Sequence, residues 1–88
     1  MFGYIYILRS LKNNRFYIGS TNNLTRRLAE HKGGLSKYTK NNLPVNLEFF
    51  QKYPTIKLAR QIEFRLKRLK RRDIIEKIIK EKNIKLEL

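Results

Sequence analysis

Cysteine is absent from the 88 residues, and no apolar run is long enough to cross a bilayer. Without thiols the chain can form neither a disulfide framework nor a cysteine-based metal site, and it suits a reducing cytoplasm. A membrane span needs about 18 consecutive apolar residues, and the N-terminus lacks the basic and apolar segments of an export signal. We therefore expect a cytoplasmic protein with no membrane partner.

Acidic residues are also few: seven Asp and Glu stand against 21 Lys and Arg, so the net charge is +14. Such an excess predicts a polyanionic partner. We expect nucleic acid, with DNA ahead of RNA, and association with the nucleoid would follow from it. Between positions 57 and 72 the basic residues are too dense to be neutralised within one helix, which favours contacts with phosphates.

A hydrophobic content of 41%, with five Tyr and five Phe, indicates a packed core and argues against a disordered basic tail. One domain over residues 1–88 is expected, because a folding unit usually has about 100 to 150 residues and a second core would not fit. We expect this domain to be a monomer.

Two short segments near the N-terminus alternate in the way that β-strands do. Residues 3–9 and 15–20 are rich in strand formers, and the two asparagines between them tolerate the positive φ of a tight turn. A period of two places Tyr6, Tyr17 and Gly19 on one face. The segments therefore predict a hairpin with two tyrosines and a glycine lining one patch.

Helical periodicity alternates with one further strand in the rest of the chain. If that strand alternates regularly, Leu47, Phe49 and Gln51 share one of its faces. The order of elements is strand, strand, helix, strand, helix, helix. The predicted elements are a helix capped by Thr21 or Asn22 and running to about Lys32, a polar loop to Pro44, a strand at 46–53, and helices at 55–70 and 73–83.

Arg27 and His31 fall on the apolar face of the first predicted helix, beside Leu24 and Leu28. Burying a guanidinium without a partner costs several kcal/mol, so either this end of the face is open to solvent or an anion meets it there. Phosphate is a natural bidentate partner for arginine. His31 is either a hydrogen-bonded surface residue or part of the same site, and a single histidine without cysteine argues against zinc.

Glu63 lies at the edge of the apolar face of the helix predicted at 55–70. Lys67 follows it by one turn and Lys70 flanks it, so a salt-bridged boundary glutamate is one interpretation. The other is an oxygen ligand for a divalent ion, and one carboxylate plus waters suits Mg²⁺. The spacing leaves both interpretations open.

The set and order of these residues resemble the GIY-YIG nuclease superfamily, and more narrowly its small stand-alone bacterial members of the UPF0213 type. The resemblance covers residues 2 to about 70. It implies a small three-stranded antiparallel sheet flanked by helices, and a metal-dependent endonuclease activity that is structure-selective and linked to DNA repair or recombination. Its elements are Tyr4-Ile5-Tyr6 and, after ten residues, Tyr17-Ile18-Gly19, followed by Arg27, His31 and Glu63.

The resemblance also implies roles for individual residues. The catalytic set is Tyr6, Tyr17, Arg27, His31 and Glu63, with Glu63 as the ligand of Mg²⁺ or Mn²⁺. Our hypothesis makes Tyr17 the general base, while Tyr6 orients it or the attacking water. Residues expected to bind nucleic acid are Gly19, where the backbone would pass close to the substrate, and Lys32, Lys37, Lys40, Arg60, Lys67, Arg68, Lys70, Arg71 and Arg72.

Three departures from the family pattern bear on catalysis. A tyrosine replaces the first glycine, Ser20 stands where excision-repair relatives have a lysine, and a downstream asparagine lacks a clear counterpart. Ser20 and the missing asparagine favour an alternative function, a basic DNA- or RNA-binding module without chemistry on the same fold. The enzyme is favoured by the residues that the chain retains, which are Tyr6, Tyr17, Arg27, His31 and Glu63. A third interpretation is an accessory protein that docks through Ile74, Ile75, Ile78 and Ile79, although these residues are better explained as core.

Overall fold

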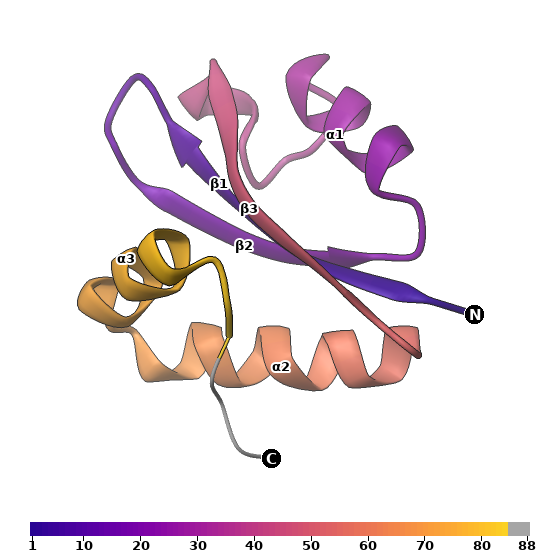
Figure 1. The fold of residues 1–88 in the computed structure, drawn as a ribbon. Helices are drawn as coiled ribbons and strands as arrows, with labels where there is room; N and C mark the ends of the chain where they lie inside the picture. The colour runs from indigo at the N-terminus through magenta and orange to yellow at the C-terminus, as the bar shows by residue number, and fades with distance from the viewer. Residues whose placement is uncertain (85–88) are drawn as a thin grey trace.

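The structure is a computed structural model that describes residues 1–84, so residues 85–88 of the predicted domain lie outside the described residues. The elements follow one another in the order ββαβαα, with a short 3-10 helix before the third strand (Figure 1). The predicted α+β fold is confirmed. The elements are β1 (Gly3–Ser10), β2 (Phe16–Thr21), α1 (Leu24–Lys32), η1 (Lys40–Asn42), β3 (Val45–Tyr53), α2 (Ile56–Leu69) and α3 (Arg72–Glu81).

The three strands form one antiparallel sheet in the order β2-β1-β3. In the predicted hairpin, Tyr6 of β1 lies opposite Gly19 of β2, and Leu8 lies opposite Tyr17. The turn passes through Asn14, whose φ of 62° is the positive value that a tight turn requires. Because β2 is an outer strand, side chains from both faces of the sheet can meet around its free edge.

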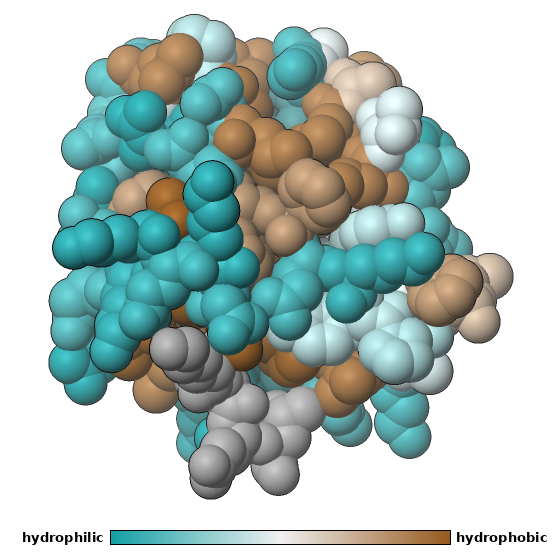
Figure 2. Space-filling view, in the orientation of Figure 1, coloured by the Kyte–Doolittle hydropathy of each residue, from teal (hydrophilic) through white to brown (hydrophobic). Residues whose placement is uncertain are grey.

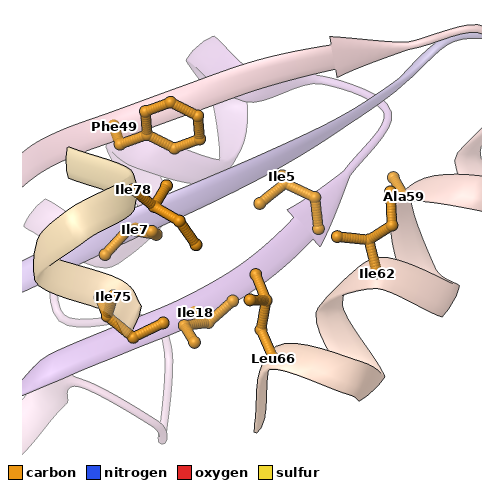
Figure 3. Close-up of a cluster of buried hydrophobic side chains, with 9 residues drawn as sticks. All are labelled: Ile5, Ile7, Ile18, Phe49, Ala59, Ile62, Leu66, Ile75 and Ile78. Atoms are coloured by element: carbon orange, nitrogen blue, oxygen red, sulfur yellow. The ribbon is translucent and has the colours of Figure 1, made fainter. Parts of the chain in front are cut away.

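The larger core lies between the sheet and the pair of helices α2 and α3, which cover the same face (Figure 1). Strand side chains point into the helices, and Figure 3 shows them meeting one apolar stripe from each helix. The stripe on α2 follows the predicted helical spacing. The buried members of this core are Ile5, Ile7, Ile18, Phe49, Ala59, Ile62, Leu66, Ile75 and Ile78.

A smaller core fills the opposite face of the sheet, under α1 (Figure 1). Tyr6 and Tyr17 both belong to it, which confirms that the two tyrosines share a face. This side therefore combines an apolar core with two phenols that extend toward the edge of β2. Its buried residues are Tyr6, Leu8, Tyr17 and Val45, packed by Leu24, Leu28, Leu43 and Leu47.

A β-bulge in β3 overturns the predicted faces of that strand. Phe49 pairs with Ile7, whereas Leu47 pairs with the next residue, Leu8, so Glu48 is an extra residue in the ladder. Leu47 consequently packs on the α1 side and Phe49 on the side of α2 and α3. The expectation that these two residues share a face was wrong, because strict alternation assumes an unbroken ladder.

The first helix begins later than expected. Its N-cap is Asn23, whose side chain accepts a hydrogen bond from the backbone N–H of Arg26, so the proposed caps at Thr21 and Asn22 were wrong. Thr21 is the last residue of β2, and its hydroxyl accepts from the backbone N–H of Asn23 at 3.1 Å. Thr21 therefore shapes the turn that leads into the helix.

The isoleucines of α3 are part of the core. Ile75 and Ile78 are buried, and Ile74 and Ile79 pack against the same cluster. Docking on another protein through these four side chains is therefore contradicted, because they already cover the sheet.

Apolar residues also reach the surface. Figure 2 shows a hydrophobic patch over β3, bordered by polar residues, and Phe50 on that strand is exposed. Within residues 1–84, none of the helices combines the length and the apolar composition that crossing a membrane would require.

Candidate active site

Tyr6 reaches across β2 to the edge of the sheet. A Cβ atom added at Gly19, its partner on β2, would overlap the Cζ and Oη atoms of Tyr6. Glycine is therefore required at position 19 because the Tyr6 ring fills the space above it. This reason differs from the close approach of substrate to backbone that the sequence led us to expect, and contact of Gly19 with nucleic acid stays a prediction.

His31 bridges Tyr6 and the loop that follows α1. The Tyr6 hydroxyl lies 2.9 Å from Nε2 of His31, and the Thr39 hydroxyl lies 2.7 Å from Nδ1. Only 1% of His31 is exposed, so a surface position for this residue was wrong. The imidazole is held from both sides and points its Nε2 atom at the phenol.

Burial sets the protonation of this pair. It lowers the pKa of His31 from its usual 6.5 to about 4, and the nearby charge of Arg27 acts in the same direction. Burial also raises the pKa of the Tyr6 phenol, although the Arg27 guanidinium opposes this shift. At neutral pH the pair is therefore an uncharged phenol hydrogen-bonded to an uncharged imidazole.

Arg27 lies near the Tyr6 hydroxyl and is partly exposed at the surface. Its Nη1 atom donates to Glu30 at 2.9 Å, its Nη2 atom lies 3.4 Å from Oγ of Ser36, and 31% of its side chain is exposed. This end of the helix face is therefore partly open to solvent, and a carboxylate meets the guanidinium there. Since a guanidinium has five N–H donors, these contacts leave others for a phosphate oxygen.

Glu63 approaches from the other face of the sheet. One carboxylate oxygen accepts a hydrogen bond from the Ser20 hydroxyl of β2, and the other lies 2.8 Å from Nζ of Lys67. The predicted ion pair with Lys67 is thus confirmed, and a divalent ion at Glu63 stays a prediction. Burial alone would lower the pKa of Lys67, but the hydrogen bond to Glu63 and its charge outweigh burial and raise the pKa, so the lysine stays charged.

Tyr17 lies two residues before Gly19 on β2 and has a different neighbour. Its ring meets that of Tyr38 edge to face, with ring centroids 4.8 Å apart. The ammonium of Lys67 lies 4.9 Å from the centroid of Tyr38. Tyr38 therefore connects the Tyr17 side of the sheet to the residue that pairs with Glu63.

Three of the other four predicted catalytic residues act on the Tyr6 hydroxyl. His31 is hydrogen-bonded to it, and the charges of Arg27 and Glu63 both act on its pKa. Tyr17 lies on the same face. The edge of β2 thus brings together a phenol, an imidazole, a guanidinium and a carboxylate that come from three different elements.

The residues at Glu63 fit a magnesium-type site with one protein ligand. Within residues 1–84, no three His, Asp or Glu side chains lie close enough to hold a metal ion together. Mg²⁺ commonly keeps several waters and binds through one or two carboxylates, and 21% of the Glu63 side chain is exposed. A cation there would compete with Lys67 for one carboxylate oxygen.

The predicted nucleic-acid-binding residues separate into groups. One group lines a pocket of about 460 Å³ between β2 and the junction of α2 and α3, and Tyr38 lines the same pocket. Arg15, which the sequence reasoning missed, belongs to this pocket. The predicted members are Lys67, Lys70, Arg71 and Arg72.

The other predicted contacts lie elsewhere. Arg60 lines a groove on the outer face of α2, where Arg68 stands over the ring of Phe64. Lys32 lines a pocket beside Pro44. Lys37 is exposed in the loop after α1, and Lys40 is exposed at the start of η1. The structure therefore gathers only part of this set beside the catalytic candidates.

Comparison with known families decides what this domain is. The family model of the GIY-YIG catalytic domain matches residues 2–85. The chain belongs to the GIY-YIG family. This GIY-YIG domain implies nuclease-like hydrolysis of phosphodiester bonds, and hence a nucleic-acid substrate.

UPF0213 proteins are similar to this GIY-YIG chain over most of its length. One from Clostridium perfringens is 37% identical over 97% of this chain and 96% of its own, and one from Bacillus licheniformis is 39% identical over 90% and 80%. The solution NMR structure of a UPF0213 protein from Bacillus halodurans has a TM-score of 0.59 and 32% identity, covering 93% of this chain and 86% of that one.

Three neighbours of this GIY-YIG site were not predicted as members of it. Thr39 holds His31, Ser20 holds Glu63, and Tyr38 packs on Tyr17. Thr39 and Tyr38 lie in an irregular loop, where no periodicity tells which way a side chain points. For Ser20 a signal existed, since it follows the second triplet and alternates with Gly19, which places it on the face of α2.

Proposed function

We propose that this protein is a divalent-metal-dependent endonuclease that hydrolyses phosphodiester bonds in DNA. The observation that supports it best is the convergence of Arg27, His31 and Glu63 on the Tyr6 hydroxyl at the free edge of β2. Hydrolysis needs a group that takes a proton from water, positive charge at the phosphate, and help for the leaving oxygen. Each need has a candidate within this constellation.

In this proposal Tyr6 is the general base, in place of Tyr17, to which our sequence hypothesis gave that role. A phenol that accepts a proton from water needs a neighbour that takes up its own proton. Nε2 of His31 lies 2.9 Å from the Tyr6 hydroxyl and can do so. Oη of Tyr6 accepts a proton from the attacking water while its own proton moves to Nε2 of His31. In the resting state of this proposal His31 carries its one proton on Nδ1, and this N–H donates a hydrogen bond to the Thr39 hydroxyl, which fixes the tautomer.

Arg27 stabilises the charge on the phosphate. Its guanidinium lies beside Tyr6 and is partly exposed, so it can meet a phosphate oxygen without leaving the protein surface. Interaction with charge that develops in the transition state is the kind of contact that contributes most to rate. Glu30 keeps the side chain oriented through its hydrogen bond to Nη1.

Glu63 is the ligand for Mg²⁺ or Mn²⁺ in this proposal. When bound, the ion supplies Lewis acidity for the phosphate and the leaving oxygen. Ser20 fixes the second carboxylate oxygen by its hydrogen bond, so the departure from lysine at this position provides a neutral support for the ligand. The net charge of +14 favours capture of the polyanionic substrate.

The test is an incubation of the purified protein with nicked, branched and linear DNA, in Mg²⁺, Mn²⁺ or EDTA. We expect cleavage that requires the divalent ion, with little dependence on sequence, because phosphate contacts carry no base information. A preference for branched or nicked DNA would support a role in repair or recombination. Tight binding in every condition without cleavage would overturn the proposal in favour of a non-catalytic binding module on the same fold.

A further inference from the structure

Glu63 is held by two different partners. The Ser20 hydroxyl binds one oxygen, and the Lys67 ammonium lies 2.8 Å from the other. Ser20 is neutral and comes from β2, whereas Lys67 is charged and comes from the same helix as Glu63, one turn later. Only the lysine therefore competes by charge with a cation at this carboxylate.

Lys67 also lines the basic pocket beside the candidate active site. The pocket has a volume of about 460 Å³ and also receives the side chains of Arg15, Lys70, Arg71 and Arg72. Of its described lining residues none is acidic, and Arg72 covers the ring of Phe16 at 4.3 Å from its centroid. Lys67, Arg71 and Arg72 pair with Glu63, Asp73 and Glu76. The five cations still leave an excess of positive charge around one hollow, which attracts a polyanion.

We propose that this pocket binds phosphates of the nucleic-acid strand next to the cleaved bond, and that Lys67 moves from Glu63 to those phosphates when the strand binds. The inference rests on the proposed function, because it assigns Glu63 to a divalent ion. Its consequence is positive coupling: nucleic acid in the pocket strengthens binding of the cation at Glu63, and the cation strengthens binding of nucleic acid.

The coupling follows from charge. With Lys67 on Glu63, a cation must displace an ammonium that is already 2.8 Å from the carboxylate. A phosphate in the pocket offers Lys67 an alternative anion, so the lysine can leave Glu63 and still have an ion-pair partner. Ser20 stays on the other oxygen and keeps the carboxylate in position. Lys67 is therefore a positioning residue that links the two ligands.

The experiment measures Mn²⁺ binding by electron paramagnetic resonance at about 0.15 M salt, with and without a cleavage-resistant phosphorothioate oligodeoxynucleotide. We expect Lys67→Met to bind Mn²⁺ about two- to five-fold more tightly than the wild type when the oligonucleotide is absent, since a partly exposed ion pair is worth about 0.2–1 kcal/mol. The oligonucleotide should tighten Mn²⁺ binding more in the wild type than in Lys67→Met.

Lys70→Met is the matched control. It removes a lysine from the same pocket, and none of the contacts described for Glu63 involves Lys70. It should weaken oligonucleotide binding and leave Mn²⁺ affinity without oligonucleotide within two-fold of the wild type. If Lys67→Met and the wild type bind Mn²⁺ equally tightly, the inference is overturned. Metal-dependent cleavage of DNA would still support the proposed function in that case. If the wild type binds no Mn²⁺, or if Glu63→Gln binds it as tightly as the wild type does, both the inference and the proposed function are overturned.

Discussion

Gly19 and Tyr6 determine how the site reaches the edge of the sheet. The phenol can extend past β2 only because position 19 has no side chain, and its hydroxyl then lies 2.9 Å from Nε2 of His31, where the charges of Arg27 and Glu63 act on its pKa. The fold therefore depends on glycine here for a packing reason, and the catalysis that we propose would depend on it indirectly.

Gly19→Ala should destabilise the protein by about 1–3 kcal/mol, because the new methyl group overlaps the Tyr6 ring and the core must shift. Urea unfolding measures the loss. In the background of Tyr6→Ala the same substitution should cost markedly less, since the overlapping ring is gone. Equal costs in both backgrounds would show that the two residues do not compete for this space.

Tyr6→Phe should lower the rate of DNA cleavage by about 10²–10⁴-fold, the usual contribution of a general base, because it removes the hydroxyl that pairs with His31. Tyr17→Phe should lower it less than ten-fold, since the contact of Tyr17 with Tyr38 uses the rings. Single-turnover cleavage compares the two variants, with circular dichroism to verify folding. A larger loss in Tyr17→Phe would return the role of base to Tyr17.

His31 should make the protein less stable as the pH falls from about 6.5 to about 4. Its pKa is about 4 when folded and near 6.5 when unfolded, so in this window the unfolded chain binds the proton more readily and acid favours unfolding. The full effect is at most about 3 kcal/mol. Urea unfolding at several pH values should show a shallower dependence in His31→Gln, and identical slopes would contradict the buried, neutral imidazole.

The sequence predicted the face on which each site residue lies better than it predicted the contacts that each residue makes. The register of the hairpin and the helical spacing indicated that Tyr6, Tyr17, Arg27 and His31 face the same side, and the structure agrees. It could not be predicted that Tyr6 would bind His31, because that contact depends on how α1 lies over the sheet. The role of Thr39 depends on a loop with no periodic pattern.

At the scale of elements, α2 carries both the core and the site. Leu66 lies on its buried stripe, Glu63 lies at the border of that stripe, and Phe64 points to solvent. The position of the carboxylate is therefore fixed by the packing of its neighbours on the same helix against β1 and β2.

Leu66→Ala should lower the free energy of unfolding by about 2–5 kcal/mol, because it leaves a cavity among fully buried side chains. Phe64→Ala on the same helix is the control, with 63% of the residue exposed, and should change stability by less than about 1 kcal/mol. Thermal or urea unfolding measures both. Similar losses in the two variants would mean that α2 packs differently.

Element order was predictable because hydrophobic periodicity reflects burial directly. The bulge at Glu48 was not, since one extra residue in a strand leaves no mark in the local pattern and depends on the pairing partner. The cap at Asn23 was missed by one or two positions because Thr21, Asn22 and Asn23 are all suitable caps, and the exact end of β2 decides among them.

At the scale of the whole molecule, the two faces of one small sheet supply different parts of the candidate site. The face under α2 and α3 supplies most of the core and the proposed acidic ligand, while the face under α1 supplies the phenols and the imidazole. The two sets meet only because β2 is an outer strand. The basic pocket opens at the same edge, so the proposed phosphate-binding site and the proposed active site are adjacent.

Cleavage of DNA by Glu63→Gln tests the central claim most directly. The substitution keeps the size of the side chain and removes its charge, and Glu76→Gln on α3, where the side chain is 58% exposed, is the matched control. We predict that Glu63→Gln loses Mg²⁺-dependent cleavage by at least about 10²-fold while binding DNA in EDTA at least as tightly as the wild type, because Lys67 is then free of its ion pair, and that the control cleaves normally. Unchanged Mg²⁺-dependent cleavage by Glu63→Gln would contradict the account.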